Sequence, residues 1–219
     1  SEPLVGRVLR DGYREKVYLA TKLPSWLIHV AEDMDKHLNE QLWRLQTDHI
    51  DFYLLHSLNK DYWENYLKLN VFDWAEKKLS EGKIRHLGFS FHDDYAVFEK
   101  ILNGYDHWDF CQIQYNYLDV EAQAGKRGLK AAAEKGLGVV IMEPLRGGNL
   151  AKIPAPRRVG EAFAKSPHAW TPANWSLQWI WNQPEVSLLL SGMSTMEQVE
   201  QNLTSADQSG VGLFMDAEH

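Results

Sequence analysis

Residues 50–56 read "IDFYLLH", a stretch of five hydrophobic residues that is interrupted by Asp51 and ends on His56. A short, nearly continuous hydrophobic run is typical of a parallel strand that is covered on both faces. We therefore predict a strand over "DFYLL" (51–55). Five further runs of the same kind predict a six-stranded set: "VYLAT" (17–21), "IRHLGFS" (84–90), "FCQIQ" (110–114), "GVVIM" (138–142) and "SLLLS" (187–191).

The segments between these runs have the spacing of helices. Met34, Leu38, Leu42 and Leu45 recur every three or four residues, the first twelve residues read as a helix, and "VEAQAGKRGLKAAAEKG" ends on Gly136, a helix stop. Alternating strands and helices predict an α/β fold, either a barrel or an open doubly wound sheet. The Gly- and Pro-containing stretch "RGGNLAKIPAPRRVG" (146–160) reads as a loop. No linker interrupts residues 1–219, which predicts a single domain.

Composition narrows the class of protein. The 219 residues are 44% hydrophobic and have a formal net charge of −7, with acidic residues spread along the chain. Neither a basic surface that binds nucleic acid nor a polybasic patch that binds membranes is therefore predicted. A single cysteine excludes an internal disulfide or a cysteine-based cluster within these residues. No leader or membrane-spanning stretch is visible. We expect a cytoplasmic protein that binds small molecules.

Polar residues recur where the predicted strands end. In parallel α/β folds these ends form the functional face. Each such residue alone reads most simply as solvated or structural, but the repetition over consecutive strands predicts one converging site. The residues are Lys22, His56, Ser90, His92, Gln112, Gln114, Glu143, Gly192 and Ser194.

The motifs around these residues resemble the aldo/keto reductase superfamily, from its third barrel strand to its eighth. They are "VYLATKLP", "DFYLLHSL", "GKIRHLGFSFHD", "CQIQYN", "VVIMEPLRGG" and "SGMSTMEQVEQNL". The resemblance implies a (β/α)8 TIM barrel whose first two strands are not in this chain, and hydride transfer between a nicotinamide dinucleotide and an aldehyde or ketone. The forms "GFSFHD" and "MEPLRGG" are similar to a branch that often has a C-terminal iron-sulfur extension, but its cysteines do not occur here.

The resemblance also implies catalytic residues. The family uses Asp, Tyr, Lys and His; Lys22 in "ATK" matches the lysine and His56 in "LLH" matches the histidine. His56 would orient the carbonyl oxygen, and Lys22 would lower the pKa of a proton-donating tyrosine. No residue here matches the family's Asp and Tyr, so we expect these 219 residues alone to reduce carbonyls weakly or not at all.

The implied cofactor is NADP ahead of NAD, since the 2′-phosphorylated form is usual in the family. Ser90, Gln112 and His92 match the nicotinamide amide contacts, and Met142 stands where many relatives stack a Tyr on the ring. Gln198 stands where several relatives have an Arg. The remaining matched positions, for the pyrophosphate and the adenosine phosphate, are Pro144, Leu145, Arg146, Gly147, Gly192, Ser194 and Asn202.

Other interpretations stay open at this point. "STMEQ" is also an ordinary capped helix start. His29, Asp33 and His37 have the spacing of metal ligands on a helix, although a solvated face is the simpler reading. Besides a reductase, the chain fits a non-catalytic nucleotide-binding or regulatory module. A metal-dependent barrel hydrolase using His56, His92 and Glu143 is the third hypothesis.

Overall fold

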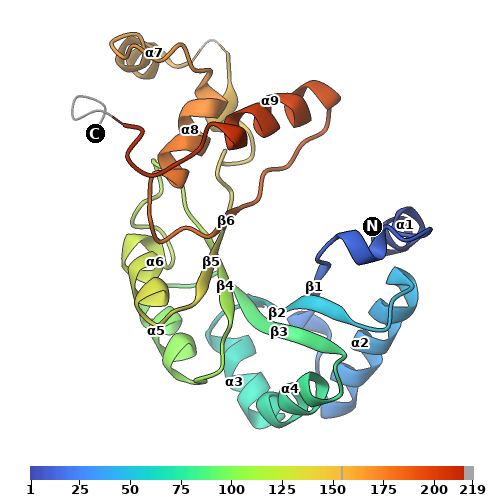
Figure 1. The fold of residues 1–219 in the computed structure, drawn as a ribbon. Coiled ribbons are helices and arrows are strands. Elements are labelled where there is room, and N and C mark those ends of the chain that lie inside the picture. Colours follow the sequence, from blue (N-terminus) through green and yellow to red (C-terminus); the bar gives the residue numbers. More distant parts are fainter. Residues whose placement is uncertain (154, 215–219) are drawn as a thin grey trace.

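The computed structural model describes residues 1–153 and 155–214. Its centre is one parallel sheet with the strand order β1-β2-β3-β4-β5-β6, so each strand pairs with its neighbours in sequence (Figure 1). The predicted runs are thereby confirmed as adjacent parallel strands. Their bounds are β1 Ala20–Leu23, β2 Ile50–Leu58, β3 Ile84–Phe91, β4 Phe110–Gln114, β5 Gly138–Met142 and β6 Leu188–Leu189.

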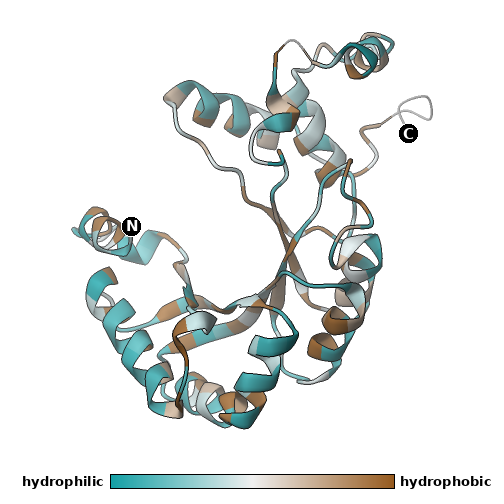
Figure 2. Ribbon diagram, turned by 180° about the vertical axis from the view of Figure 1, so that it is seen from behind, coloured by the Kyte–Doolittle hydropathy of each residue, from teal (hydrophilic) through white to brown (hydrophobic). Residues whose placement is uncertain are grey.

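Helices follow the strands and lie on the outer side of the curved sheet, so that the whole forms a crescent with α1 and α9 at its two ends (Figure 1). Hydrophobic residues are concentrated in the strands, and the helices mix hydrophilic with hydrophobic positions (Figure 2). The helices are α1 Glu2–Val8, α2 Ala31–Leu45, α3 Lys60–Lys68, α4 Val71–Ser80, α5 Tyr95–Asn103, α6 Gly125–Glu134, α7 Arg157–Phe163, α8 Pro172–Trp181 and α9 Met196–Asp207.

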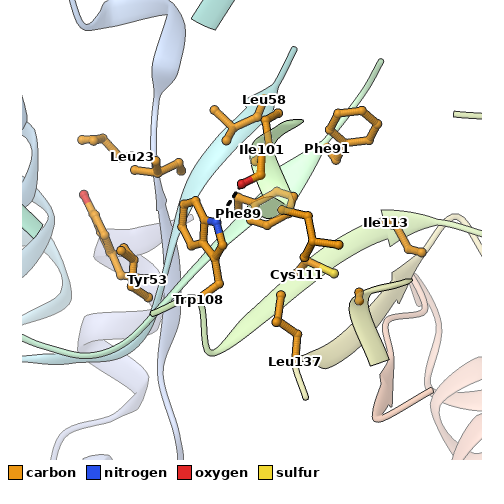
Figure 3. Close-up of a cluster of buried hydrophobic side chains, with 14 of the residues drawn as sticks. Leu23, Tyr53, Leu58, Phe89, Phe91, Ile101, Trp108, Cys111, Ile113 and Leu137 are labelled. Atoms are coloured by element: carbon orange, nitrogen blue, oxygen red, sulfur yellow. Dashed lines mark hydrogen bonds between the residues drawn. The ribbon is translucent and has the colours of Figure 1, made fainter. Parts of the chain in front are cut away.

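The hydrophobic core lies between the sheet and these helices. Leu55, Phe89 and Cys111 point to the helix side of β2, β3 and β4, and all three are fully buried. Trp108, beside Phe89 and Cys111 in Figure 3, donates its indole N–H to the carbonyl of Ile101 at 3.1 Å. Because successive side chains of a strand alternate between its faces, residues next to these core positions point to the inner, concave face.

Several predicted boundaries were wrong. β1 begins later than the predicted run and includes Lys22, and β2 continues past His56 to Leu58. The stretch 146–160 is only partly a loop, because it contains a 3-10 turn at Asn149–Ala151 and the start of α7. Gly136 follows α6 with a φ of 82°, which confirms it as a helix stop.

An ion cluster joins the first strands at their N-terminal ends. Asp51, 1% exposed, accepts hydrogen bonds from the backbone N–H of Leu19 at 2.8 Å, from Arg14 at 2.8 Å and from Arg85 at 2.9 Å. Burial raises the pKa of the Asp51 carboxyl, but the Leu19 N–H and the Arg14 guanidinium outweigh it and leave the pKa below its usual value. The polar interruption in "IDFYLLH" is therefore an ionised carboxylate that fixes β2 to the segment before β1.

Candidate active site

Strand register brings the predicted site residues to one face. Lys22 of β1 pairs with Leu54 of β2, and paired residues of parallel strands point the same way. His56 is two residues beyond Leu54 and so shares its face. The same relation continues across the sheet, because Ser90 pairs with Gln112 and Gln114 pairs with Met142. Lys22, His56, Ser90, Gln112 and Met142 therefore all belong to the inner face, near the C-terminal ends of their strands.

The charge of Lys22 acts on the His56 ring. Both side chains are half-buried. Burial lowers the pKa of the Lys22 ammonium group. Burial, followed by the positive charges of Lys22 and His92, lowers the pKa of the His56 ring from 6.5 to about 4. At neutral pH the His56 ring is uncharged, and one ring N–H is available as a hydrogen-bond donor.

A β-bulge lies immediately at His56. Leu55 pairs with Phe89 and Leu58 pairs with Phe91, so two residues of β2 stand opposite the single residue Ser90. Ser57, the second of the two, has a φ of 56°, which is left-handed backbone. Bulges of this kind occur next to active sites, where they redirect a side chain. The sequence predicted that the strand ends at His56. In the structure, the pairing of β2 with β3 is interrupted at His56 and Ser57 and resumes at Leu58.

Two contacts of His56 were not predicted. Trp26 lies in the 3-10 turn Ser25–Leu27 after β1, and its ring centroid is 4.9 Å from that of His56. Trp26 is 46% exposed, so one part of its ring faces solvent and the other packs beside His56. Ser25 of the same turn donates its hydroxyl to the carbonyl of His56. The only sequence signal for these residues was their place in the loop after a strand that ends near a site lysine.

Amide side chains cover the middle of the inner face. Gln112 donates to the sulfur of Met142 at 3.1 Å, and Gln123 donates to the side-chain oxygen of Gln114 at 3.2 Å. His92 follows β3; burial lowers the pKa of its ring, and the Gln123 side chain and the charge of Glu143 act in the opposite direction. Gln123 was not predicted, because it lies in the loop after β4, well beyond the strand end.

A cavity of about 680 Å³ lies beside the C-terminal ends of β5 and β6. Glu143 is the one charged residue among the described residues that line it, and it accepts a hydrogen bond from the N–H of Gly147 at 2.8 Å. Arg146 is not part of the lining; its guanidinium pairs with Asp119 at 3.1 Å. The predicted cofactor residues that the cavity does bring together are Pro144, Leu145, Gly147, Gly192, Ser194, Gln198 and Asn202.

The start of α9 forms part of the cavity wall. Thr195 caps the helix by accepting from the N–H of Gln198, and the Gln198 side chain accepts from the N–H groups of Ser194 at 2.7 Å and Thr195 at 3.3 Å. This is a capping box, so the ordinary interpretation of "STMEQ" is confirmed. Asn202 donates to the hydroxyl of Ser191 at 3.1 Å. Gln198 and Asn202 thus already have protein partners at the cavity.

Metal binding would need several donor side chains close together among the residues that the structure describes. Among these residues, no three His, Cys, Asp or Glu side chains lie close enough together to hold a metal ion. His56, His92 and Glu143 do not form such a set either. Asp33 instead accepts from the N–H groups of His29 and Val30 at the start of α2. None of the helices described has the length and apolar character needed to cross a membrane.

Comparison with known proteins identifies the class. The family model "Aldo/keto reductase family" matches residues 1–209, and the chain belongs to that family. It is 25% identical over 244 residues to the uncharacterized oxidoreductase YrpG of Bacillus subtilis, a match that covers 95% of this chain and 73% of YrpG. The fold is the α/β barrel type of this family, here with six parallel strands.

Two solved structures support the fold assignment. The aldo-keto reductase AKR11C1 from Bacillus halodurans, in its holo form, has a TM-score of 0.80 at 22% identity, covering 99% of this chain and 75% of its own. An aldo-keto reductase from Klebsiella pneumoniae in complex with NADPH has a TM-score of 0.73 at 26% identity, covering 96% of this chain and 71% of its own. Family and fold together indicate an oxidoreductase.

Proposed function

We propose that this chain takes part in hydride transfer between a nicotinamide dinucleotide and an aldehyde or ketone carbonyl, as one partial barrel domain. The observation that supports this most is the placement of Lys22 and His56. They lie on neighbouring strands, point to one face, and are close enough for the charge of Lys22 to contribute to the low pKa of His56. A neutral hydrogen-bond donor beside a cation suits a carbonyl oxygen that becomes negatively charged.

The chain's own groups have distinct tasks in this proposal. The bound nicotinamide would supply the hydride. The His56 N–H orients the carbonyl oxygen, and the Lys22 charge stabilises the negative charge that develops on that oxygen. The proton for the new alkoxide comes from an acid, and no residue among the 219 matches the family's tyrosine. Turnover by this chain alone is therefore expected to be weak or absent.

The cavity beside β5 and β6 is the proposed dinucleotide site. Its lining offers backbone N–H groups, hydroxyls and amides next to Met142 and Gln112, and a relative of the same fold is in complex with NADPH. No Lys or Arg occurs among its described lining residues, so a 2′-phosphate would meet neutral donors only. We propose that the site accepts NADP and NAD with little discrimination, although NADP is the usual family cofactor.

Titration calorimetry with NADPH and NADH tests the site. The variant Gln198→Ala with Asn202→Ala removes two polar groups from the cavity wall and should weaken binding of both dinucleotides. Thr204→Ala is the matched control, because Thr204 is exposed and donates its hydroxyl to the carbonyl of Glu200 within α9, away from the cavity lining. Equal affinity in the parent and the double variant, with binding measurable in both, would remove this cavity from the proposal.

A non-catalytic nucleotide-binding module is the second candidate, because the cavity beside β5 and β6 accounts for dinucleotide binding without requiring a reaction. Both functions require dinucleotide binding, so calorimetry does not separate them. Steady-state reduction of a reactive aldehyde does separate them, because a module without chemistry gives no turnover even when the upstream segment with the family's Asp and Tyr is supplied.

A further inference from the structure

The peptide group between His56 and Ser57 lies where the pairing of β2 with β3 is interrupted. Its carbonyl belongs to His56 and its N–H to Ser57, and both residues stand opposite Ser90. A bulge takes such groups out of the regular ladder, and buried backbone groups need other partners. The left-handed backbone at Ser57 adds strain that an ordinary L residue tolerates only when its surroundings hold it in place.

Two serine side chains provide the missing partners. Ser25, from the turn after β1, donates its hydroxyl to the carbonyl oxygen of His56. Ser90, from β3, accepts a hydrogen bond from the N–H of Ser57 at 2.7 Å. Ser25 is 2% exposed and Ser90 is 1% exposed, so water does not compete for either bond. One peptide group is thus held by β3 on one side and by the turn after β1 on the other.

Tyr66 of α3 supports the first of these bonds. Its hydroxyl is 3.0 Å from the hydroxyl oxygen of Ser25. Because Ser25 uses its only hydroxyl hydrogen toward His56, Tyr66 must be the donor to Ser25. Tyr66 is 1% exposed, and burial raises its pKa, which keeps it protonated and able to donate. The chain of donors runs from Tyr66 to Ser25 to the His56 carbonyl.

We propose that Ser25 and Ser90, with Tyr66 behind Ser25, are positioning residues that clamp the His56–Ser57 peptide and so hold the His56 ring on the inner face against Trp26. The catalytic meaning of this clamp rests on the proposed function, in which His56 orients the substrate carbonyl. The clamp also gives Ser90 a task in the protein itself, besides the nicotinamide contact that family resemblance implies.

The pKa of the His56 ring reports whether the ring stays in place. Its value of about 4 depends first on burial and then on Lys22 and His92, so a ring that moves into water should return toward 6.5. We expect Ser25→Ala and Ser90→Ala each to increase the proton affinity of the ring roughly tenfold, measured by NMR titration of labelled histidines. His56→Gln in each background identifies the signal among the nine histidines.

Matched variants separate positioning from general loss of stability. Ser25→Thr keeps a hydroxyl and should retain the His56 pKa of the parent chain. Tyr66→Phe should shift the His56 pKa less than Ser25→Ala does. Ser176→Ala is the control, because Ser176 is also fully buried and donates to a backbone carbonyl, that of Pro172, at 2.9 Å. It should lower the melting temperature without changing the His56 titration.

An unchanged His56 pKa in the alanine variants would overturn the clamp. If Ser25→Ala does not fold, Ser90→Ala and Tyr66→Phe decide by the same criterion. The readout needs neither cofactor nor turnover. A chain that binds no dinucleotide but shows the expected titrations would contradict the proposed function and support the clamp. Dinucleotide binding with unchanged His56 titrations would contradict the clamp and leave the proposed function unaffected.

Discussion

Lys22 of β1 and His56 of β2 point to the same face of the sheet, and the positive charge of Lys22 helps to keep the His56 ring neutral. Replacing Lys22 by Met should therefore raise the pKa of His56 above about 4, but not as far as 6.5, because burial is the larger cause and remains. NMR titration measures the change. Lys16→Met is the control, because Lys16 contacts Tyr13 before β1 and should leave the His56 titration unchanged. A parent-like titration in Lys22→Met would contradict the pairing.

The low pKa of His56 also predicts how stability depends on pH. The ring has a pKa of about 4 in the folded chain and 6.5 ordinarily, so between these values the unfolded chain binds more protons than the folded chain. The free energy of unfolding should therefore fall as the pH decreases from 6.5 to about 4. Urea unfolding at several pH values should show a smaller fall for His56→Gln. His29→Gln, at an exposed position outside the site, should retain the full fall.

Asp51 should be far more important for stability than its exposed partner Arg85. Asp51→Ala leaves the Arg14 guanidinium without its buried partner, and breaking a buried pair in this way costs ~3–5 kcal/mol. Arg85→Ala removes a partner whose side chain is 54% exposed and should cost ~1 kcal/mol or less. Urea unfolding of both variants tests the contrast, and equal losses would show that the cluster does not secure β2.

Turnover should depend on a proton donor from outside these residues. A positioned general acid contributes ~10²- to 10⁴-fold, and Lys22 is a poor substitute for a phenol because it is a cation that gives up its proton reluctantly. We expect the 219-residue chain to reduce a reactive aldehyde slower by about that factor than a chain extended by the upstream segment with the family's Asp and Tyr. Equal rates would show that this tyrosine is not needed.

Gln198 offers a test of cofactor preference. Gln198→Arg places a cation at the cavity wall, and a hydrogen bond to a charged group is worth ~1.5 kcal/mol or more, so NADPH affinity should rise about tenfold while NADH affinity changes little. The change also removes the Gln198 cap of α9, so Gln198→Ala, which loses the cap and the amide group without adding a cation, is the control. A parallel gain for both dinucleotides would place the 2′-phosphate elsewhere.

The sheet was predictable from sequence because a strand buried on both faces has a nearly unbroken hydrophobic run. The bounds of β4 and β5 match the predicted runs, whereas β2 continues past its run because its pairing with β3 resumes at Leu58 after the bulge. The ends of β1 and β6 were wrong because these are the outer strands, where pairing on one side alone decides which residues count as strand. The helix at the end of the stretch 146–160 was missed because its Gly and Pro residues indicate a loop.

The site was predictable only in part. Strand-end polarity and family resemblance led to Lys22, His56 and Gln112, because a two-residue alternation fixes their face once the register is known. The β-bulge at Ser57 was not predictable, because no residue type at this position indicates that the backbone of Ser57 is left-handed. Ser25, Trp26 and Gln123 were missed because they reach the inner face from loops, whose path depends on tertiary packing. Arg146 was assigned to the cofactor channel by its place in a motif, but its side chain pairs with Asp119.

Asp51 and His56 of strand β2 should differ in how they tolerate replacement. Asp51 at one end is charged and surrounded by cations, and His56 near the other is uncharged and beside Lys22 and Trp26. A saturation mutagenesis screen that records protein abundance and activity separately should therefore give different results at the two positions. Substitutions at Asp51 should lower the amount of protein in the cell, whereas substitutions at His56 should leave the amount unchanged and remove function.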